Sequence, residues 1–135
     1  MWSCTTVNNV TSPKTIVDTT GTMTDIDGNI YATVKIGSQT WMTEDLKTTT
    51  FNDGTAISYI TDMSNWEVEA GSGGNITYNT TPEYCYYNFL YSNRYTYGAL
   101  YNSSAARSGK LGPAGWHVPT AACLRKPRHK RLGTG

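Results

Sequence analysis

The sequence is short of the residues that build an ordinary apolar core. Of its 135 residues 38% are hydrophobic and only two are Phe, whereas Tyr (ten) and Trp (four) supply most of the large side chains. Tyr and Trp bury an apolar body while keeping a polar end for water or a partner. Thr, Asn, Ser and Gly fill much of the rest, which argues against a helical cytosolic enzyme and favours a β-rich, loop-rich exterior domain. The length allows one domain.

Long apolar runs and a usable cysteine pattern are also missing. No stretch approaches the roughly 18 apolar residues that a bilayer-spanning helix needs. The three cysteines, Cys4, Cys85 and Cys123, are odd in number and widely spaced. They therefore give neither a disulfide framework nor a zinc-binding spacing, and we predict no metal and no cofactor.

Acidic residues are absent after Glu83. Residues 1–124 hold six basic and ten acidic residues, a formal charge of −4, whereas 125–131 hold five basic residues. Such a basic segment could bind nucleic acid or anionic lipid by neutralising phosphates. It contains no aromatic residue and follows no recognisable binding fold. We therefore expect residues 121–135 to be a disordered basic tail that does not pack on the body, and predict no nucleic-acid partner.

The N-terminus offers two interpretations. Residues 1–4 (Met-Trp-Ser-Cys) resemble the end of a bacterial lipoprotein signal, in which a small residue precedes the Cys that is lipidated. The alternative is an ordinary start followed by a disordered segment. In either case we expect residues 1–21 to be a flexible tether, with a membrane contact only through a lipid on Cys4.

Residues 22–42 predict a three-stranded antiparallel meander. The segment 22–26 alternates as a short strand, and Asp27-Gly28 predicts a tight turn because Gly accepts a positive φ. A second strand covers 29–36, Gly37-Ser38 turns, and 39–42 returns. The face that we expect to turn toward the core, together with Trp41, carries Ile30, Ala32, Val34 and Ile36.

The signals weaken after residue 42. We expect one helical turn over 43–46, a turn at 52–55 and a strand over 56–60. Asp62 is a helix-capping residue type, so a short helix is expected over 62–66. From residue 84 onward the chain is rich in Tyr.

Several short segments follow one another in a fixed order. The ordered set identifies a family more specifically than any single segment does. They are Asp-Ile-Asp-Gly-Asn-Ile-Tyr (25–31), Val-Lys-Ile-Gly (34–37), Gln-Thr-Trp-Met (39–42), Tyr-Cys-Tyr-Tyr-Asn (84–88), Tyr-Gly-Ala-Leu-Tyr-Asn (97–102) and Gly-Trp-His-Val-Pro-Thr (115–120). Together they resemble the Fibrobacter succinogenes major paralogous domain family over residues 22–120.

The resemblance implies a secreted or surface protein of a Bacteroidetes-like bacterium, extracellular or on the outer membrane, and often lipidated. It also implies an α+β fold, C-type-lectin-like and similar to formylglycine-generating enzymes, with small twisted antiparallel sheets, short helices and long loops. In the family, acidic residues and a Trp on a helix follow the Thr at 120. Here Ala121-Ala122-Cys123 follows instead. We therefore expect 22–120 to be an incomplete domain.

The aromatic residues are the candidate ligand contacts. Aromatic faces can cover the C–H groups of a sugar while phenol hydroxyls bond its hydroxyls. The alternative is that most are core residues, which we expect for Trp41 and Trp116. The side chains that we predict to contact a ligand are Tyr84, Tyr86, Tyr87, Tyr91 and Trp66.

No catalytic site is visible in the sequence. His117 stands beside Trp116 in a structural segment, and no nucleophile can be placed near it, so we expect a packed histidine. Asp25-x-Asp27 resembles half of a calcium loop but lacks its later ligands, which favours a plain hairpin turn. We predict a non-catalytic binding or structural module for a glycan or protein surface. The alternative is an accessory domain of a polysaccharide-degrading system.

Overall fold

The structure, a computed structural model, describes residues 5–6, 17–66, 69–70, 76–77 and 80–124. It is an α+β arrangement of small sheets, short helices and long loops, as the sequence predicts. None of the helices in these ranges has the length or the apolar character that crossing a membrane requires.

Four antiparallel strands form the first sheet, in the order β1-β4-β3-β2. They are β1 (Thr5–Thr6), β2 (Val17–Thr24), β3 (Ile30–Ile36) and β4 (Gln39–Met42). The bounds of β3 and β4 confirm the predicted meander. Gly28 and Gly37 take φ values of 82° and 63° at the two turns, the left-handed region that favours Gly.

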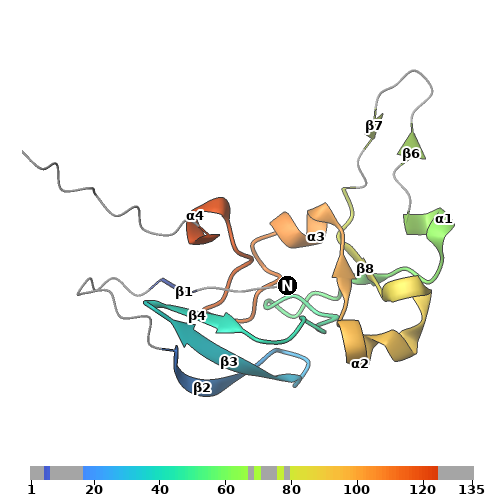
Figure 1. Ribbon diagram of the computed structural model, residues 1–135. Coiled ribbons are helices and arrows are strands. Elements are labelled where there is room, and N and C mark those ends of the chain that lie inside the picture. The colour runs from blue at the N-terminus through green and yellow to red at the C-terminus, as the bar shows by residue number, and fades with distance from the viewer. Residues whose placement is uncertain (1–4, 7–16, 67–68, 71–75, 78–79, 125–135) are drawn as a thin grey trace, which may run out of the picture.

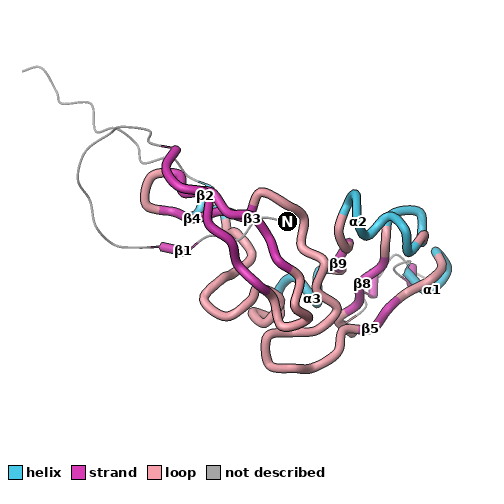
Figure 2. Tube along the Cα trace, turned by 90° about the horizontal axis from the view of Figure 1, so that it is seen from below, coloured by secondary structure: helices cyan, strands magenta, loops and turns pink. Residues whose placement is uncertain are grey.

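A second sheet has the order β5-β8-β9, and a two-stranded ribbon pairs β6 with β7. The β5–β8 pairing is parallel, which differs from the all-antiparallel expectation. Figures 1 and 2 show the two larger sheets apart from each other, with β2, β3 and β4 on one side of the described structure and β8 on the other. The strands are β5 (Ser58–Tyr59), β6 (Glu69–Ala70), β7 (Ile76–Thr77), β8 (Glu83–Cys85) and β9 (Leu100–Tyr101).

The helices are all short and lie between or after the strands. They are α1 (Met63–Trp66), the 3-10 turns η1 (Tyr87–Phe89) and η2 (Tyr91–Asn93), α2 (Arg94–Tyr97), α3 (Ser103–Arg107) and α4 (Ala121–Leu124). The expected cap is present at α1, where the Asn65 N–H donates to Asp62 Oδ1 at 3.1 Å. Residues 43–46 form no helix, contrary to the prediction.

The face of β3 that turns inward is the opposite of the predicted one. Tyr31 (0% exposed) and Thr33 (4%) are buried, while Ile30 is 64% exposed. Opposite them lie Met23 on β2 and Met42 on β4, both buried. Trp41, opposite Val34, is therefore on the outer face and only half-buried. Tyr31 occupies the inner face because its hydroxyl is satisfied there, as described below.

Because Ile30 lies on the outer face of β3, we predict that replacing it has little effect on stability. We expect Ile30→Thr to change the free energy of unfolding by less than about 0.5 kcal/mol, because an exposed β-branched residue is replaced by another. Urea denaturation followed by tryptophan fluorescence measures this. A loss above about 2 kcal/mol would mean that the outer face is covered after all.

The ends of the predicted domain also differ from the structure. Strand β2 begins at Val17, which pairs with Ile36, so the sheet starts inside the segment predicted to be a tether over 1–21. Residues 121–124 form α4, and Gln39 Nε2 on β4 donates to the Cys123 carbonyl at 3.3 Å. The expectation that this part of the tail stays off the body is therefore wrong. Residues 125–135 lie outside the described residues.

Candidate functional site

Two of the predicted ligand contacts, Tyr84 and Tyr86, belong to the core. Strand β8 is the central strand of the second sheet, and Tyr84 and Tyr86 are 7% and 2% exposed. The Tyr84 ring stacks on that of Tyr59 at 5.1 Å and meets that of Tyr86 edge-on at 5.7 Å. Burial raises the pKa of both phenols. Neither ring is available to a ligand, which corrects the prediction.

Tyr87 and Tyr91, by contrast, are on the surface, and two further tyrosines accompany them. The four side chains are half or more exposed and come from η1, η2 and α2. Clustered exposed aromatic residues mark binding surfaces more often than scattered ones do. We call this set the tyrosine surface: Tyr87 (50% exposed), Tyr91 (55%), Tyr95 (71%) and Tyr97 (50%).

Contacts within the tyrosine surface fix its rings. The Tyr87 and Tyr97 rings meet edge-on at 5.2 Å. The guanidinium of Arg94 lies 5.1 Å from the ring centroids of both Tyr91 and Tyr95, and its Nη1 donates to the Tyr91 hydroxyl. A cation over an aromatic face attracts the ring electrons, so Arg94 orders both rings before any ligand arrives.

The backbone that presents this surface is strained. Asn88 and Phe89 have φ values of 52° and 55°, in the left-handed region. Asn tolerates this region, but a bulky residue such as Phe rarely adopts it. The Phe89 N–H donates to the Tyr86 carbonyl at 2.8 Å, and Asn93 Nδ2 donates to the Tyr87 carbonyl at 2.7 Å. These bonds hold a costly conformation, a feature that is enriched at functional sites.

A polar cleft adjoins the tyrosine surface and shares Tyr95 with it. Its volume is about 350 Å³. Four of its lining residues come from the loop after β4, a segment in which the sequence predicts a helical turn and no binding site. The lining residues are Thr43, Glu44, Asp45, Lys47, Tyr95, Thr96 and Gly98.

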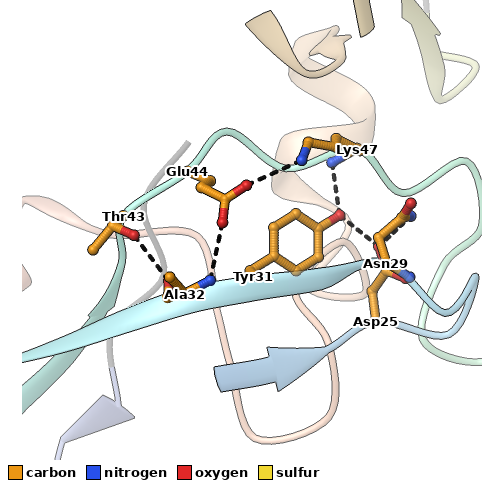
Figure 3. A network of polar contacts seen from close by, with 7 residues as sticks. All are labelled: Asp25, Asn29, Tyr31, Ala32, Thr43, Glu44 and Lys47. Atoms are coloured by element: carbon orange, nitrogen blue, oxygen red, sulfur yellow. Dashed lines mark hydrogen bonds and ion pairs between the residues drawn. The ribbon is translucent and has the colours of Figure 1, made fainter. Parts of the chain in front are cut away.

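Glu44 in this cleft is held by two hydrogen bonds (Figure 3). Its Oε1 accepts from the Ala32 N–H at 3.1 Å and its Oε2 from Lys47 Nζ at 3.1 Å. The bond from Ala32 and then that from Lys47 lower the pKa of this carboxyl. A general acid needs a raised pKa instead, so Glu44 is suited to accepting hydrogen bonds and not to donating a proton.

A partly buried network of hydrogen bonds joins the first sheet to the loop that lines the cleft (Figure 3). The Tyr31 hydroxyl donates to Asp25 Oδ2 at 2.6 Å and accepts from the Lys47 N–H at 2.9 Å. Asn29 donates to both oxygens of Asp25 at 2.9 Å. Burial, followed by the bond to Asp25, raises the pKa of Tyr31. The network seats the cleft residue Lys47 against β3.

Asp25 and Asp27 act as hydrogen-bond acceptors in this turn. Asp27 Oδ2 accepts from Thr48 Oγ1 at 3.2 Å and Thr49 Oγ1 at 3.0 Å. Burial alone would raise the pKa of Asp27, but its bonds from the threonines at 48–50 outweigh burial and lower it. Within the described ranges no three His, Cys, Asp or Glu side chains gather as a metal site.

The remaining predicted site residues lie elsewhere. Trp66 is half-buried at the end of α1, outside the segment that carries the tyrosine surface. Trp116 is partly buried and packs against the core. Cys4 lies outside the described residues. Cys123, to which no sequence pattern assigns a role, lies beside His117, because the chain turns back between these two residues as it enters α4.

Comparison with known families gives one match. The model of the Fibrobacter succinogenes major domain matches residues 34–124, about two thirds of the chain. Neither the curated proteins nor the solved structures contain a match. The match covers the end of β3, all of β4, the residues of the polar cleft and of the tyrosine surface, and α4. The chain therefore belongs to the Fibrobacter succinogenes major domain family.

Proposed function

We propose that this chain is a non-catalytic binding module that holds a neutral glycan between the tyrosine surface and the polar cleft. The observation that carries the proposal is the position of Tyr95, 71% exposed, at the junction of the two. A sugar presents apolar C–H faces and hydroxyl edges at once. The tyrosine rings can cover the C–H faces, while Glu44 and Lys47 can form hydrogen bonds with the hydroxyls.

The charges of the cleft favour a neutral ligand over an anionic one. Glu44 and Asp45 outnumber Lys47 among its charged residues. Arg94, the cation of the tyrosine surface, is already engaged with two rings. A phosphate backbone would meet net negative charge here, so nucleic acid is a poor candidate.

We further propose that the module acts outside the cell or on the outer-membrane surface, and that its fold is C-type-lectin-like. Both ideas rest on the family resemblance. Exposed tyrosines are also enriched where proteins contact other surfaces. The tyrosine surface is therefore suited to a glycan that is carried on another cell.

Binding is tested with a panel of neutral oligosaccharides by calorimetry. We expect Tyr95→Ala to weaken binding at least about tenfold, because a central exposed ring carries much of the binding free energy. Ile30→Ala is the control, since Ile30 is similarly exposed but on β3. Raising salt from about 0.05 to 0.5 M should change the affinity little.

Two results would overturn the proposal. One is a panel without any binder, or a Tyr95→Ala variant that binds as well as the parent. The other is tight, salt-sensitive binding of DNA or RNA that disappears when residues 125–135 are deleted, which would assign the function to the basic segment.

A further inference from the structure

A thiol and an imidazole meet at the end of the described chain. The distance from His117 Nε2 to Cys123 Sγ is 3.2 Å, and Thr120 Oγ1 lies 3.6 Å from the same sulfur. Cys123 and His117 are both half-buried, so the sulfur is not sealed in the core. A nucleophile within hydrogen-bond reach of a base is the arrangement by which proteins activate a thiol.

Both partners are held by the fold. Trp116 and Val118, on either side of His117, pack against the core. On the other side, the Cys123 N–H donates to the Thr120 carbonyl at 3.0 Å, and Gln39 Nε2 ties the Cys123 carbonyl to β4. The contact between sulfur and imidazole therefore joins two anchored segments.

The second described cysteine is a contrast within the same molecule. Cys85 is 2% exposed in the central strand β8, and neither it nor Cys123 is in a disulfide. Burial raises the pKa of the Cys85 thiol. A reagent in solution should thus distinguish the two sulfurs.

We propose that Cys123 is a reactive thiol, activated by His117, that exchanges with small disulfides. The Cys123 proton passes to His117 Nε2, and the thiolate attacks one sulfur of R–S–S–R. A Cys123–S–S–R bond forms as the S–S bond of the reagent breaks. The leaving thiolate R–S⁻ takes up the proton as RSH, so Cys123 is oxidised and half of the disulfide is reduced.

The chemistry is independent of the glycan proposal. Because Cys85 is buried, it is not placed to resolve the mixed disulfide, which an external thiol can release by attacking it. The site is therefore a reversible attachment point for a small thiol compound.

The test follows the reaction of an aromatic disulfide, dithionitrobenzoate, with the full chain carrying Cys4→Ser. We expect the folded protein to release one equivalent of thiolate rapidly, and Cys123→Ser to lose this rapid phase. The second equivalent, from Cys85, should appear only after denaturation. His117→Gln should slow the rapid phase at least about tenfold, because the amide is not a base. His129→Gln, at the only other histidine, should not.

Two further measurements make the result decisive. Free imidazole should restore part of the rate to His117→Ala, which a purely structural role of the ring would not allow. Mass spectrometry after brief alkylation of the parent protein should place the label on Cys123 and not on Cys85. The proposal fails if Cys123 reacts no faster when folded than when denatured, or if His117→Gln keeps the parent rate.

Discussion

Replacing Tyr31 with Ala is expected to lower the free energy of unfolding by about 3–5 kcal/mol, the range for a large buried aromatic side chain. Tyr31 is fully buried on the inner face of β3, and its ring packs in the core with Met23 and Met42. The change leaves a cavity and also removes the hydroxyl that joins Asp25 to Lys47. Urea denaturation of parent and variant measures the difference.

Tyr31→Phe is the matched control, because it keeps the ring and removes only the hydroxyl. Asp25 Oδ2 keeps its bond from Asn29, but the Lys47 N–H loses its acceptor. We expect a cost of about 1–3 kcal/mol, smaller than that of Tyr31→Ala. Equal costs for the two variants would show that the ring contributes nothing, and would contradict the inward orientation of Tyr31.

This orientation shows what the pattern of β3 could and could not predict. Alternation over 29–36 located the strand, since period two is a local property of the chain. It could not choose the inner face, because both faces hold apolar groups and register decides between them. Tyr31 lies on the inner face because its hydroxyl bonds two groups there, Asp25 across the turn before β3 and the Lys47 N–H in the loop after β4.

The candidate site was likewise predictable from the sequence only in part. Tyrosine-rich composition pointed to the region of Tyr87 and Tyr91, which are exposed. It could not separate them from Tyr84 and Tyr86, because the pairing of β8 with β5 and β9 is long-range. The polar cleft was missed for a related reason, since it joins residues 43–47 to residues 95–98, and nothing local links them.

The segments 43–47 and 95–98 come into close contact at Gly98. Its φ and ψ are 65° and −153°, a combination that is open essentially only to Gly. A Cβ there would lie 2.7 Å from Asp45 Cβ and 2.7 Å from the Leu46 carbonyl oxygen. That same carbonyl accepts from the Ala99 N–H at 2.8 Å. A side chain at 98 would therefore push apart the contact that joins α2 to the cleft loop.

We expect Gly98→Ala to lower the free energy of unfolding by roughly 3–5 kcal/mol, through backbone strain and overpacking together. Gly54→Ala is the control, because Gly54 also has a positive φ, 87°, but a Cβ there meets nothing within 4 Å. It should cost only about 1–2 kcal/mol. Urea denaturation compares the variants, and equal costs would mean that residues 45–46 do not lie against Gly98. Since Gly98 lines the cleft, the folded fraction of Gly98→Ala should also bind glycan more weakly, whereas Gly54→Ala should bind like the parent.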